Sequence, residues 1–285
     1  MGLFMDGDGI PLAFNITAGN TNEQITLTPL EEKILKDFEL SKFIVCTDAG
    51  LASNDNRKFN NKEDRAFITT QSIKKLKKHL KDWALDKKNW SVAGDTKKYD
   101  ISKLEETEES KKLNYNKTFY KKRWITEIGL EQALIVTYSL KYKNYQQKIR
   151  NAQIERARKA IQNKNIKIDK CNPNDYKRFI LKTAVTEDGE VAENKAFTIN
   201  HKAIAEEEKY DGFYGVCTNL EDNVEEIIKV NHRRWEIEES FRIMKSEFKA
   251  RQVYLSRDDR IQAHFMTCFI ALLIHRLLEK KIEPM

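Results

Sequence analysis

The chain has 285 residues, of which 40% are hydrophobic and 33% charged, a composition typical of a folded soluble protein rather than a disordered one. It opens without a secretory signal, and its four cysteines lack metal-finger spacing, so we predict reduced thiols and a cytoplasmic location. The most apolar stretch, residues 265–278, is interrupted by His275 and Arg276 and is too short to span a bilayer. We therefore predict a buried helix there and no membrane association.

The net charge of +7 is unevenly distributed. Residues 73–170 contain 26 Lys and Arg against 12 Asp and Glu, a net charge of +14, which leaves −7 for the rest of the chain. A basic middle between acidic ends indicates a polyanion-binding surface, such as one for nucleic acid, beside a core that carries carboxylates. A solvated lysine-rich surface gives the same composition, so charge alone leaves both interpretations open.

The first elements in chain order predict a sheet. Two apolar runs within residues 2–18 are separated by Asp-Gly-Asp-Gly, which is typical of a β-hairpin. A helix is predicted over residues 23–38, and strands over 42–48 and 65–70. The order hairpin, helix, strand, strand implies a mixed sheet with helices packed on it.

The middle of the chain, residues 73–210, alternates lysine clusters with tryptophans, and we interpret it as an inserted subdomain between segments 1–72 and 211–285. Its predicted elements are strands over 133–142, 179–185 and 195–199, a turn at 187–189 and a basic helix over 145–162. Residues 213–217 predict the strand that returns to the core.

The last segment is predicted to be helical, with helices from about residue 222 to 248 and over 259–280. One apolar stripe of the first helix comprises Ile237, Phe241, Met244 and Phe248. Arg234, Glu238 and Lys245 share a neighbouring face, which holds one carboxylate between two cations at the edge of the core. An ordinary amphipathic helix with Arg–Glu pairing one turn apart gives the same spacing, so this pattern alone does not decide for a site.

A second carboxylate, Asp48, ends the most continuous apolar strand and precedes a small residue and a glycine. Active-site groups in α/β proteins gather at the carboxyl ends of strands, although an aspartate that caps the next segment would look the same. Two hard carboxylates that converge from a strand end and a helix would suit Mg²⁺ or Mn²⁺.

These residues carry a resemblance. Arg234, Glu238 and Lys245 reproduce the spacing of the Y-(2)-R-(3)-E-(6)-K signature of insertion-sequence transposases of the DDE class, with Asn231 in place of the tyrosine. The strand that ends at Asp48 resembles the strand that carries the second aspartate in that family. The segments 6–23 and 211–219 are also similar, so the resemblance covers nearly the whole chain and is weakest in its basic middle.

The resemblance implies an α/β fold of the RNase H-like type, a mixed sheet flanked by helices and interrupted by a large basic insertion. It also implies DNA-mediated transposition, with hydrolysis and strand transfer at the transposon ends, a homodimer in the synaptic complex, and association with the nucleoid when DNA is bound. Asp48 and Glu238 would be catalytic and would hold Mg²⁺ or Mn²⁺. The residues expected to contact DNA are Arg234, Lys245, His232, Arg233, Lys121, Lys122, Arg123, Arg156 and Arg158.

One departure concerns the first catalytic aspartate of the family, which the resemblance places on a strand ahead of residue 2. Asp6 and Asp8 lie in the predicted hairpin turn and are poor substitutes, so we expect an N-terminally truncated catalytic core. Three alternatives remain: a non-catalytic remnant that binds DNA, another RNase H-like nuclease such as a junction resolvase, and a lysine-rich structural protein in which Asp48 and Glu238 lie far apart.

Overall fold

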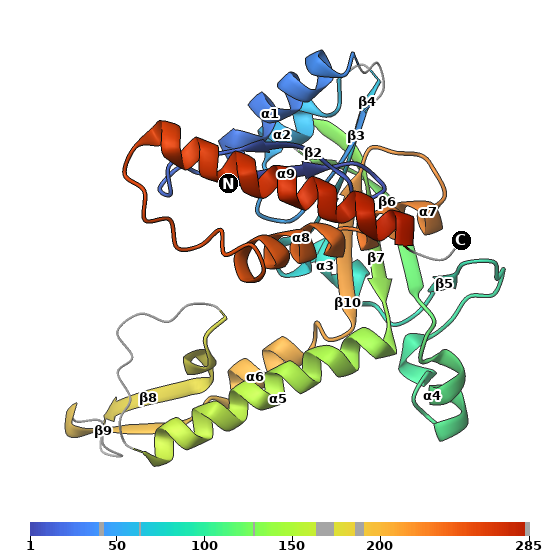
Figure 1. The fold of residues 1–285 in the computed structure, drawn as a ribbon. Coiled ribbons are helices and arrows are strands. Elements are labelled where there is room, and N and C mark those ends of the chain that lie inside the picture. Colours follow the sequence, from blue (N-terminus) through green and yellow to red (C-terminus); the bar gives the residue numbers. More distant parts are fainter. Residues whose placement is uncertain (40–42, 63, 128, 164–173, 186–190, 283–285) are drawn as a thin grey trace. The chain divides into compact units, whose positions relative to one another are not determined.

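The computed structural model describes residues 1–39, 43–62, 64–127, 129–163, 174–185 and 191–282 (Figure 1). The chain divides into two compact units. The first unit comprises Met1–Gln71, Lys122–Ile135 and Val216–Met285, and the second comprises Ser72–Lys121 and Val136–Gly215. Residues 122–135, in the middle of the predicted insertion, thus belong to the first unit. The predicted turn at 187–189 and Cys171 lie outside the described residues.

The strands are β1 (Gly2–Met5), β2 (Pro11–Asn15), β3 (Phe43–Thr47), β4 (Arg65–Thr70), β5 (Ser91–Val92), β6 (Phe119–Glu127), β7 (Leu130–Tyr138), β8 (Ile180–Val185), β9 (Val191–Ile199) and β10 (Phe213–Thr218). The α-helices are α1 (Gln24–Asp37), α2 (Asn54–Phe59), α3 (Lys78–Leu85), α4 (Glu108–Asn114), α5 (Leu140–Gln162), α6 (His201–Glu208), α7 (Val224–His232), α8 (Trp235–Ser246) and α9 (Asp258–Ile282).

The main sheet is mixed, which confirms the predicted fold class. Its strand order is β3-β4-β10-β7-β6-β5, with β3 parallel to β4 and β10 antiparallel to β4. The apolar run of β4 reflects its position between two neighbours, since its four central residues are all buried. Strands β1 and β2 form a separate antiparallel hairpin, and β8 pairs with β9 in a third, two-stranded sheet.

The predicted hairpin is confirmed, and the side chain of Asp6 stabilises its turn. The Asp6 carboxylate accepts hydrogen bonds from the backbone N–H groups of Asp8 (2.9 Å) and Ile10 (2.8 Å). Gly9 has a φ of 77°, a left-handed conformation that glycine adopts without steric cost. Asp6 therefore stabilises a turn, as its position in the sequence indicated.

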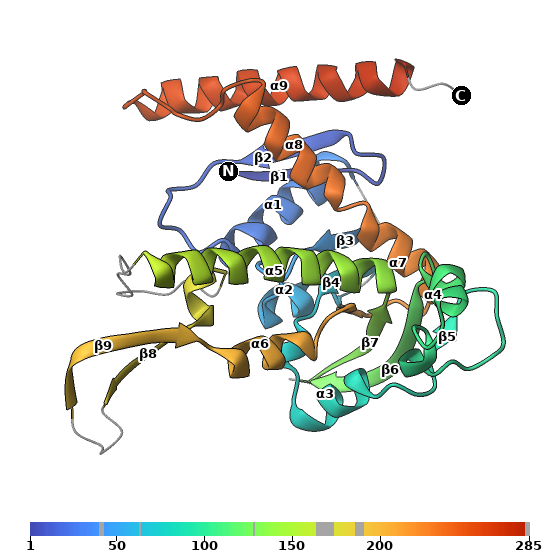
Figure 2. The same cartoon turned by 90° about the horizontal axis from the view of Figure 1, so that it is seen from below.

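In the first unit, α9 runs alongside the hairpin and α8 (Figure 2). Hydrophobic side chains pack these elements together. Phe14 of β2 lies against Phe269 of α9 with ring centroids 4.9 Å apart. The buried members of this cluster are Ile243, Met244, Ala250, Cys268 and Leu272. The predicted inner stripe of α8 is only partly correct, because Met244 is buried with Ser240 and Ile243, whereas Ile237 and Phe241 are half-buried.

The second unit has its own core around Trp90, which is fully buried and packs at a tilted angle against the rings of Tyr138 and Phe213. Strand β7 ends earlier than predicted because the Ser139 hydroxyl accepts a hydrogen bond from the backbone N–H of Tyr142 and caps α5. Arg150 of α5 forms a buried, two-point ion pair with Asp211, at 2.6 and 2.7 Å. This pair anchors the long basic helix inside its unit.

The helix near the C-terminus was predicted to be buried, and the structure corrects this prediction. Helix α9 has 25 residues, and its length and composition would suffice to cross a membrane. Only Cys268, Leu272 and Arg276 on it are buried, and several of its large apolar side chains are about half exposed. The helix extends beyond the apolar stretch 265–278, because the mostly polar residues 258–264 and 279–282 are also helical.

Candidate active site

Asp48 directly follows the last residue of β3, an edge strand of the main sheet, and is exposed at the carboxyl end of that strand. Its Oδ1 accepts hydrogen bonds from the backbone N–H groups of Gly50 (2.8 Å) and Leu51 (3.1 Å). A Cβ atom added at Gly50 would lie 3.1 Å from Asp48 Oδ1, so the glycine allows this tight turn. These two hydrogen bonds fix the orientation of the carboxylate. Because both involve Oδ1, Oδ2 is not used by the turn.

The carboxyl end of β4 lies beside Asp48 because the two strands are parallel and in register. Thr47 is paired with Thr69, and their hydroxyl groups are 3.0 Å apart in a buried hydrogen bond. The Thr69 hydroxyl also lies 3.4 Å from the backbone oxygen of Asp48. The next residue, Thr70, is therefore a neighbour of the Asp48 turn at the same sheet edge.

The junction between α7 and α8 contacts these strand ends. Arg234, at the N-terminal boundary of α8, donates through Nη1 to the Thr70 hydroxyl. Asn231, buried at the end of α7, has its Oδ1 3.9 Å from the thiol of Cys46 in β3. Burial raises the pKa of the Cys46 thiol to about 11, with Arg234 opposing the shift, so the thiol stays protonated and can donate.

Glu238 follows Arg234 by one helical turn, and its backbone N–H donates to the Arg234 carbonyl oxygen at 3.4 Å. Its side chain is exposed and forms no hydrogen bond or ion pair with any residue that the structure describes. Lys245 lies on the same face two turns further on, exposed, with its ammonium 5.8 Å from the centre of the Phe241 ring. The Arg234–Thr70 contact thus ties the start of the helix that carries Glu238 to the sheet edge that carries Asp48.

Residues 1–274 match the family model described as "Transposase DDE domain". The chain belongs to this family. No curated protein and no solved structure matches it.

The family assignment makes the transposase domain a member of a family of enzymes that act in transposition, as the resemblance implied. Divalent metal is general in the family. Within the described residues, no group of three or more His, Cys, Asp or Glu side chains is gathered closely enough to hold a metal. Asp48 and Glu238 therefore stand as a candidate pair whose chemistry, exposed hard oxygen donors, fits a divalent cation.

The two other aspartates near the N-terminus of the transposase domain serve different contacts. The Asp6 carboxylate is used by the hairpin turn, as described above. Asp8 lies 3.8 Å from Arg233 and 3.6 Å from Lys280. Arg233 also donates to the backbone oxygen of Gly7. Arg233, predicted to contact DNA, is thus oriented toward the hairpin, whereas His232 is exposed at the end of α7.

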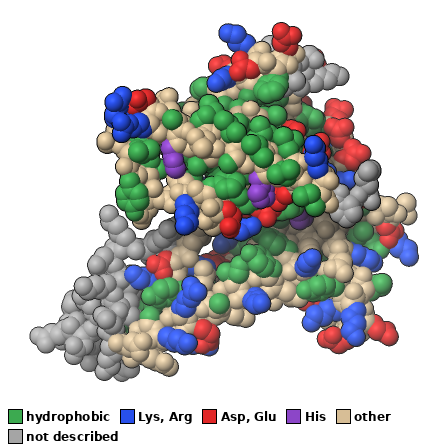
Figure 3. All heavy atoms as spheres, viewed as in Figure 1, with side chains coloured by type: hydrophobic (Ala, Val, Ile, Leu, Met, Phe, Trp, Pro, Cys, Tyr) green, Lys and Arg blue, Asp and Glu red, His purple; other side chains and the backbone are tan. Residues whose placement is uncertain are grey.

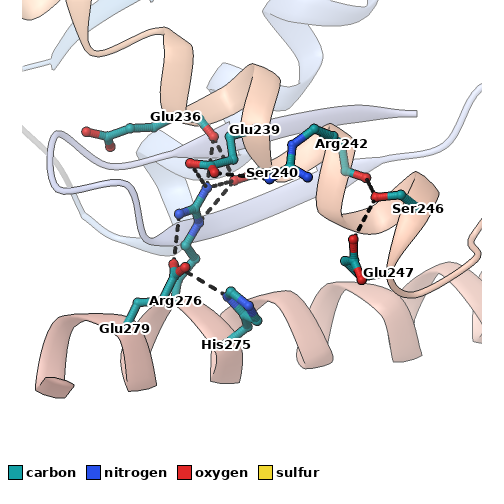
Figure 4. A network of polar contacts seen from close by, with 9 residues as sticks. All are labelled: Glu236, Glu239, Ser240, Arg242, Ser246, Glu247, His275, Arg276 and Glu279. Carbon is teal, nitrogen blue, oxygen red and sulfur yellow. Dashed lines mark hydrogen bonds and ion pairs between the residues drawn. The ribbon is translucent and has the colours of Figure 1, made fainter. Parts of the chain in front are cut away.

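An arginine that the sequence interpretation did not assign holds α8 in place (Figure 4). Arg276 of α9 is 9% exposed and donates to the Ser240 hydroxyl (2.9 and 3.2 Å) and to the Glu236 carbonyl oxygen (3.2 Å). It also pairs with Glu279 at 2.8 Å and lies 3.6 Å from Glu239. The sequence could have indicated this role, because Arg276 is an arginine within the most apolar stretch of the chain. A charged side chain in such a stretch is buried only where polar partners pair with it.

The basic residues predicted to contact DNA divide into exposed and structural ones. Lys121 is 7% exposed, and its ammonium donates to the Asp86 carbonyl oxygen at 2.8 Å and lies over the Trp90 ring. The Lys121 ammonium is therefore used inside the second unit, which argues against the predicted contact with DNA. Trp90, one of the tryptophans of the same basic segment, is likewise a core side chain.

The remaining cations are accessible. Arg123 is exposed, and Lys122 is half-buried with its ammonium 3.4 Å from the Glu221 carbonyl oxygen. Arg158 is exposed and pairs with Glu155, one turn away on α5. Arg156 is exposed and, with Lys159 and neighbouring residues, lines an open hollow of about 490 Å³. These residues are available for contact with a polyanion.

Proposed function

We propose that this transposase domain is the catalytic core that cuts DNA at transposon ends and joins them to a target, with Asp48 and Glu238 holding a divalent cation. The observation that supports it most is the hydrogen bond from Arg234 to Thr70. This contact links the start of the Glu238 helix to the strand end beside Asp48, which is what a shared cation requires.

The donor atoms suit Mg²⁺ or Mn²⁺, which prefer carboxylate oxygens. Both side chains are exposed, and Asp48 is oriented by two backbone N–H groups that bond to one of its oxygens. When bound, a divalent cation lowers the pKa of water and stabilises charge on the attacking and leaving oxygens of a phosphodiester. The role of Asp48 and Glu238 is to fix its position.

The reaction proposed has two displacements at phosphorus. In the first, a water oxygen bonds to phosphorus while the bond to the 3′ oxygen breaks, which releases a 3′-hydroxyl at the transposon end. In the second, that hydroxyl oxygen attacks a target phosphodiester, and the target's own 3′ oxygen leaves. Lys245, exposed on the Glu238 face, supplies a positive charge to the DNA backbone, and Arg234 keeps the helix at the strand ends.

The DNA partner would be held through phosphate contacts outside the cleavage centre. Arg123, Arg156 and Arg158 are exposed, and Lys122 is partly so. Each phosphate contact releases a bound counterion, so affinity for DNA falls steeply as salt rises. Action at two ends in a synaptic complex implies a dimer, and we place the protein with chromosomal DNA in the cytoplasm.

Titration of Mn²⁺, followed by electron paramagnetic resonance, tests the proposed carboxylate pair without depending on catalysis. Asp48→Asn and Glu238→Gln should each weaken Mn²⁺ binding by about tenfold or more, since each removes one charged ligand. Glu247→Gln, an exposed carboxylate just past the end of α8, is the matched control and should leave binding unchanged.

A cleavage assay tests the reaction itself. The DNA should be a plasmid that carries the element's terminal sequences, incubated with Mn²⁺ and with the wild type, the control or each variant. Cutting by the wild type that is lost in Glu238→Gln supports the proposal. Salt-sensitive DNA binding with neither Mn²⁺ binding nor cutting would reject it in favour of a non-catalytic DNA-binding protein.

A further inference from the structure

Helix α9 has a second apolar face, opposite the one that packs on the hairpin and α8. Its buried side chains, Cys268 and Leu272, lie one turn apart on the inner face. Met266, Ile270, Ile274 and Leu277 lie on the outer face, each 46–53% exposed. In the space-filling view, hydrophobic side chains gather along α9 on the side turned to the viewer (Figure 3). A helix that is apolar all round is normally covered on every side.

The outer face of α9 is apolar in its middle and charged at its two ends. At about 100° per residue, the positions closest to the centre of the face are 259, 263, 266, 270, 274, 277 and 281. The positions from 263 to 277 carry apolar side chains, and the two end positions carry Asp259 and Lys281. These seven positions, called the seam below, span about six turns at roughly 3.67 residues per turn, a period that keeps them on one side of a nearly straight helix. The outer face can therefore match a copy of itself that runs in the opposite direction.

The charges at the two ends of the outer face favour one direction of pairing between two copies. The seam begins with Asp259 and ends with Lys281, which carry opposite charges, and both are exposed. Acidic residues occupy the first turn of α9 and basic residues the last. A copy that ran parallel would bring like charges together at each end, whereas an antiparallel copy brings opposite charges together.

We propose that the outer face of α9 binds a second copy of this chain, with the two α9 helices antiparallel and the two-fold axis at Ile270. In this register Ile270 meets the partner's Ile270, and Met266 meets the partner's Ile274. Asp259 then faces the partner's Lys281 at both ends of the seam. The interface is isologous, so one face on each copy suffices and the assembly closes at two.

The area of this face is consistent with a dimer that forms and dissociates. Four seam side chains that are about half exposed, together with their flanks, offer on the order of 500 Å² per copy. A pair would bury roughly 1,000 Å² in total, near the lower bound for a specific interface. The dimer should therefore depend on protein concentration. This surface is separate from Asp48 and Glu238, so the inference does not depend on the proposed catalytic role.

Sedimentation equilibrium of the DNA-free chain over a range of concentrations tests the proposal. The wild type should dimerise reversibly, and Ile270→Glu, which places two carboxylates together at the two-fold axis, should raise the dissociation constant by about tenfold or more. Ile25→Glu on α1 is the matched control, because Ile25 is also an exposed helical isoleucine, at 65%, and should leave the constant unchanged. Circular dichroism should show the same helix content in all three proteins.

Charge reversal tests the antiparallel direction. Asp259→Lys and Lys281→Glu should each weaken self-association, and a mixture of these two variants should associate as well as the wild type, because both ends then pair opposite charges. A wild type that stays monomeric, or a dimer unaffected by Ile270→Glu, would overturn the proposal. So would sedimentation of the wild type but not of Ile270→Glu with phospholipid vesicles, because it would assign the face to a membrane surface.

Discussion

Replacing Arg276 by methionine should loosen α8 from α9, because it removes the donor at the centre of their polar contacts (Figure 4). The variant removes both hydrogen bonds that the fully buried Ser240 hydroxyl accepts, and one of those that the Glu236 carbonyl oxygen accepts; the hydrogen bond from Ser240 to Glu236 remains. A hydrogen bond to a charged group contributes about 1.5–3 kcal/mol. Methionine recovers part of the apolar packing, and Glu279 stays partly solvated, so we expect a loss of about 3 kcal/mol in the free energy of unfolding.

Arg242→Met provides the matched control, since Arg242 lies on α8 within the same group of side chains. Its side chain is 63% exposed, and its guanidinium pairs with Glu239 at 3.2 Å, one turn away. Exposed pairs of this kind contribute less than about 0.5 kcal/mol. Urea unfolding followed by far-ultraviolet circular dichroism compares the two variants, with unchanged denaturant dependence as the condition for comparing midpoints. Equal stability of Arg276→Met and Arg242→Met would refute the assignment of Arg276 as the residue that holds α8.

Three further substitutions test other parts of the structure. Glu31 is fully buried, and desolvation raises the pKa of its carboxyl to about 7. The stability that protonated Glu31 contributes is fully present below about pH 4.5 and is lost as the pH rises through 7. Glu31→Gln should therefore be more stable than the wild type at pH 8 by up to about 3 kcal/mol and should unfold with a weaker pH dependence; an unchanged pH profile would contradict this. Arg150→Met should cost about 3–5 kcal/mol in thermal or urea unfolding, because it leaves the buried Asp211 carboxylate unpaired, and the double variant Arg150→Met with Asp211→Leu should recover much of the loss. Gly50→Ala should displace the Asp48 carboxylate and weaken Mn²⁺ binding with little change in unfolding midpoint; unaltered binding would show that the turn does not orient Asp48.

Much of the fold could be predicted from local pattern. The apolar run that ends at Asp48 and the run over residues 65–70 predicted β3 and β4, because strands buried between neighbours have few polar interruptions. The turn at residues 6–9 predicted the hairpin because Asp and Gly favour its backbone conformation. The end of β7 was misplaced because an apolar pattern continues past Ser139, and only the capping hydroxyl shows where the helix starts.

The features that local pattern could not predict depended on contacts between distant segments. Lys121 has the composition of a surface cation, and nothing in its neighbours along the chain shows that the Asp86 carbonyl oxygen, 35 residues earlier, accepts from it. Helix α9 was predicted to be buried because it is apolar, but packing covers only one of its faces. The contact between Arg234 and Thr70 joins residues 164 positions apart, so spacing could propose the carboxylate pair and could not locate it.

The proposed activity requires Asp48 and Glu238 to share one cation at the carboxyl end of β3. Crystals soaked in Mn²⁺ and measured at the manganese absorption edge test this directly. We predict a single anomalous peak at this sheet edge, within coordination distance of an oxygen of each carboxylate and lost in Glu238→Gln crystals. A peak bound by one carboxylate alone, or two carboxylates on separate surfaces with no common peak, would contradict it.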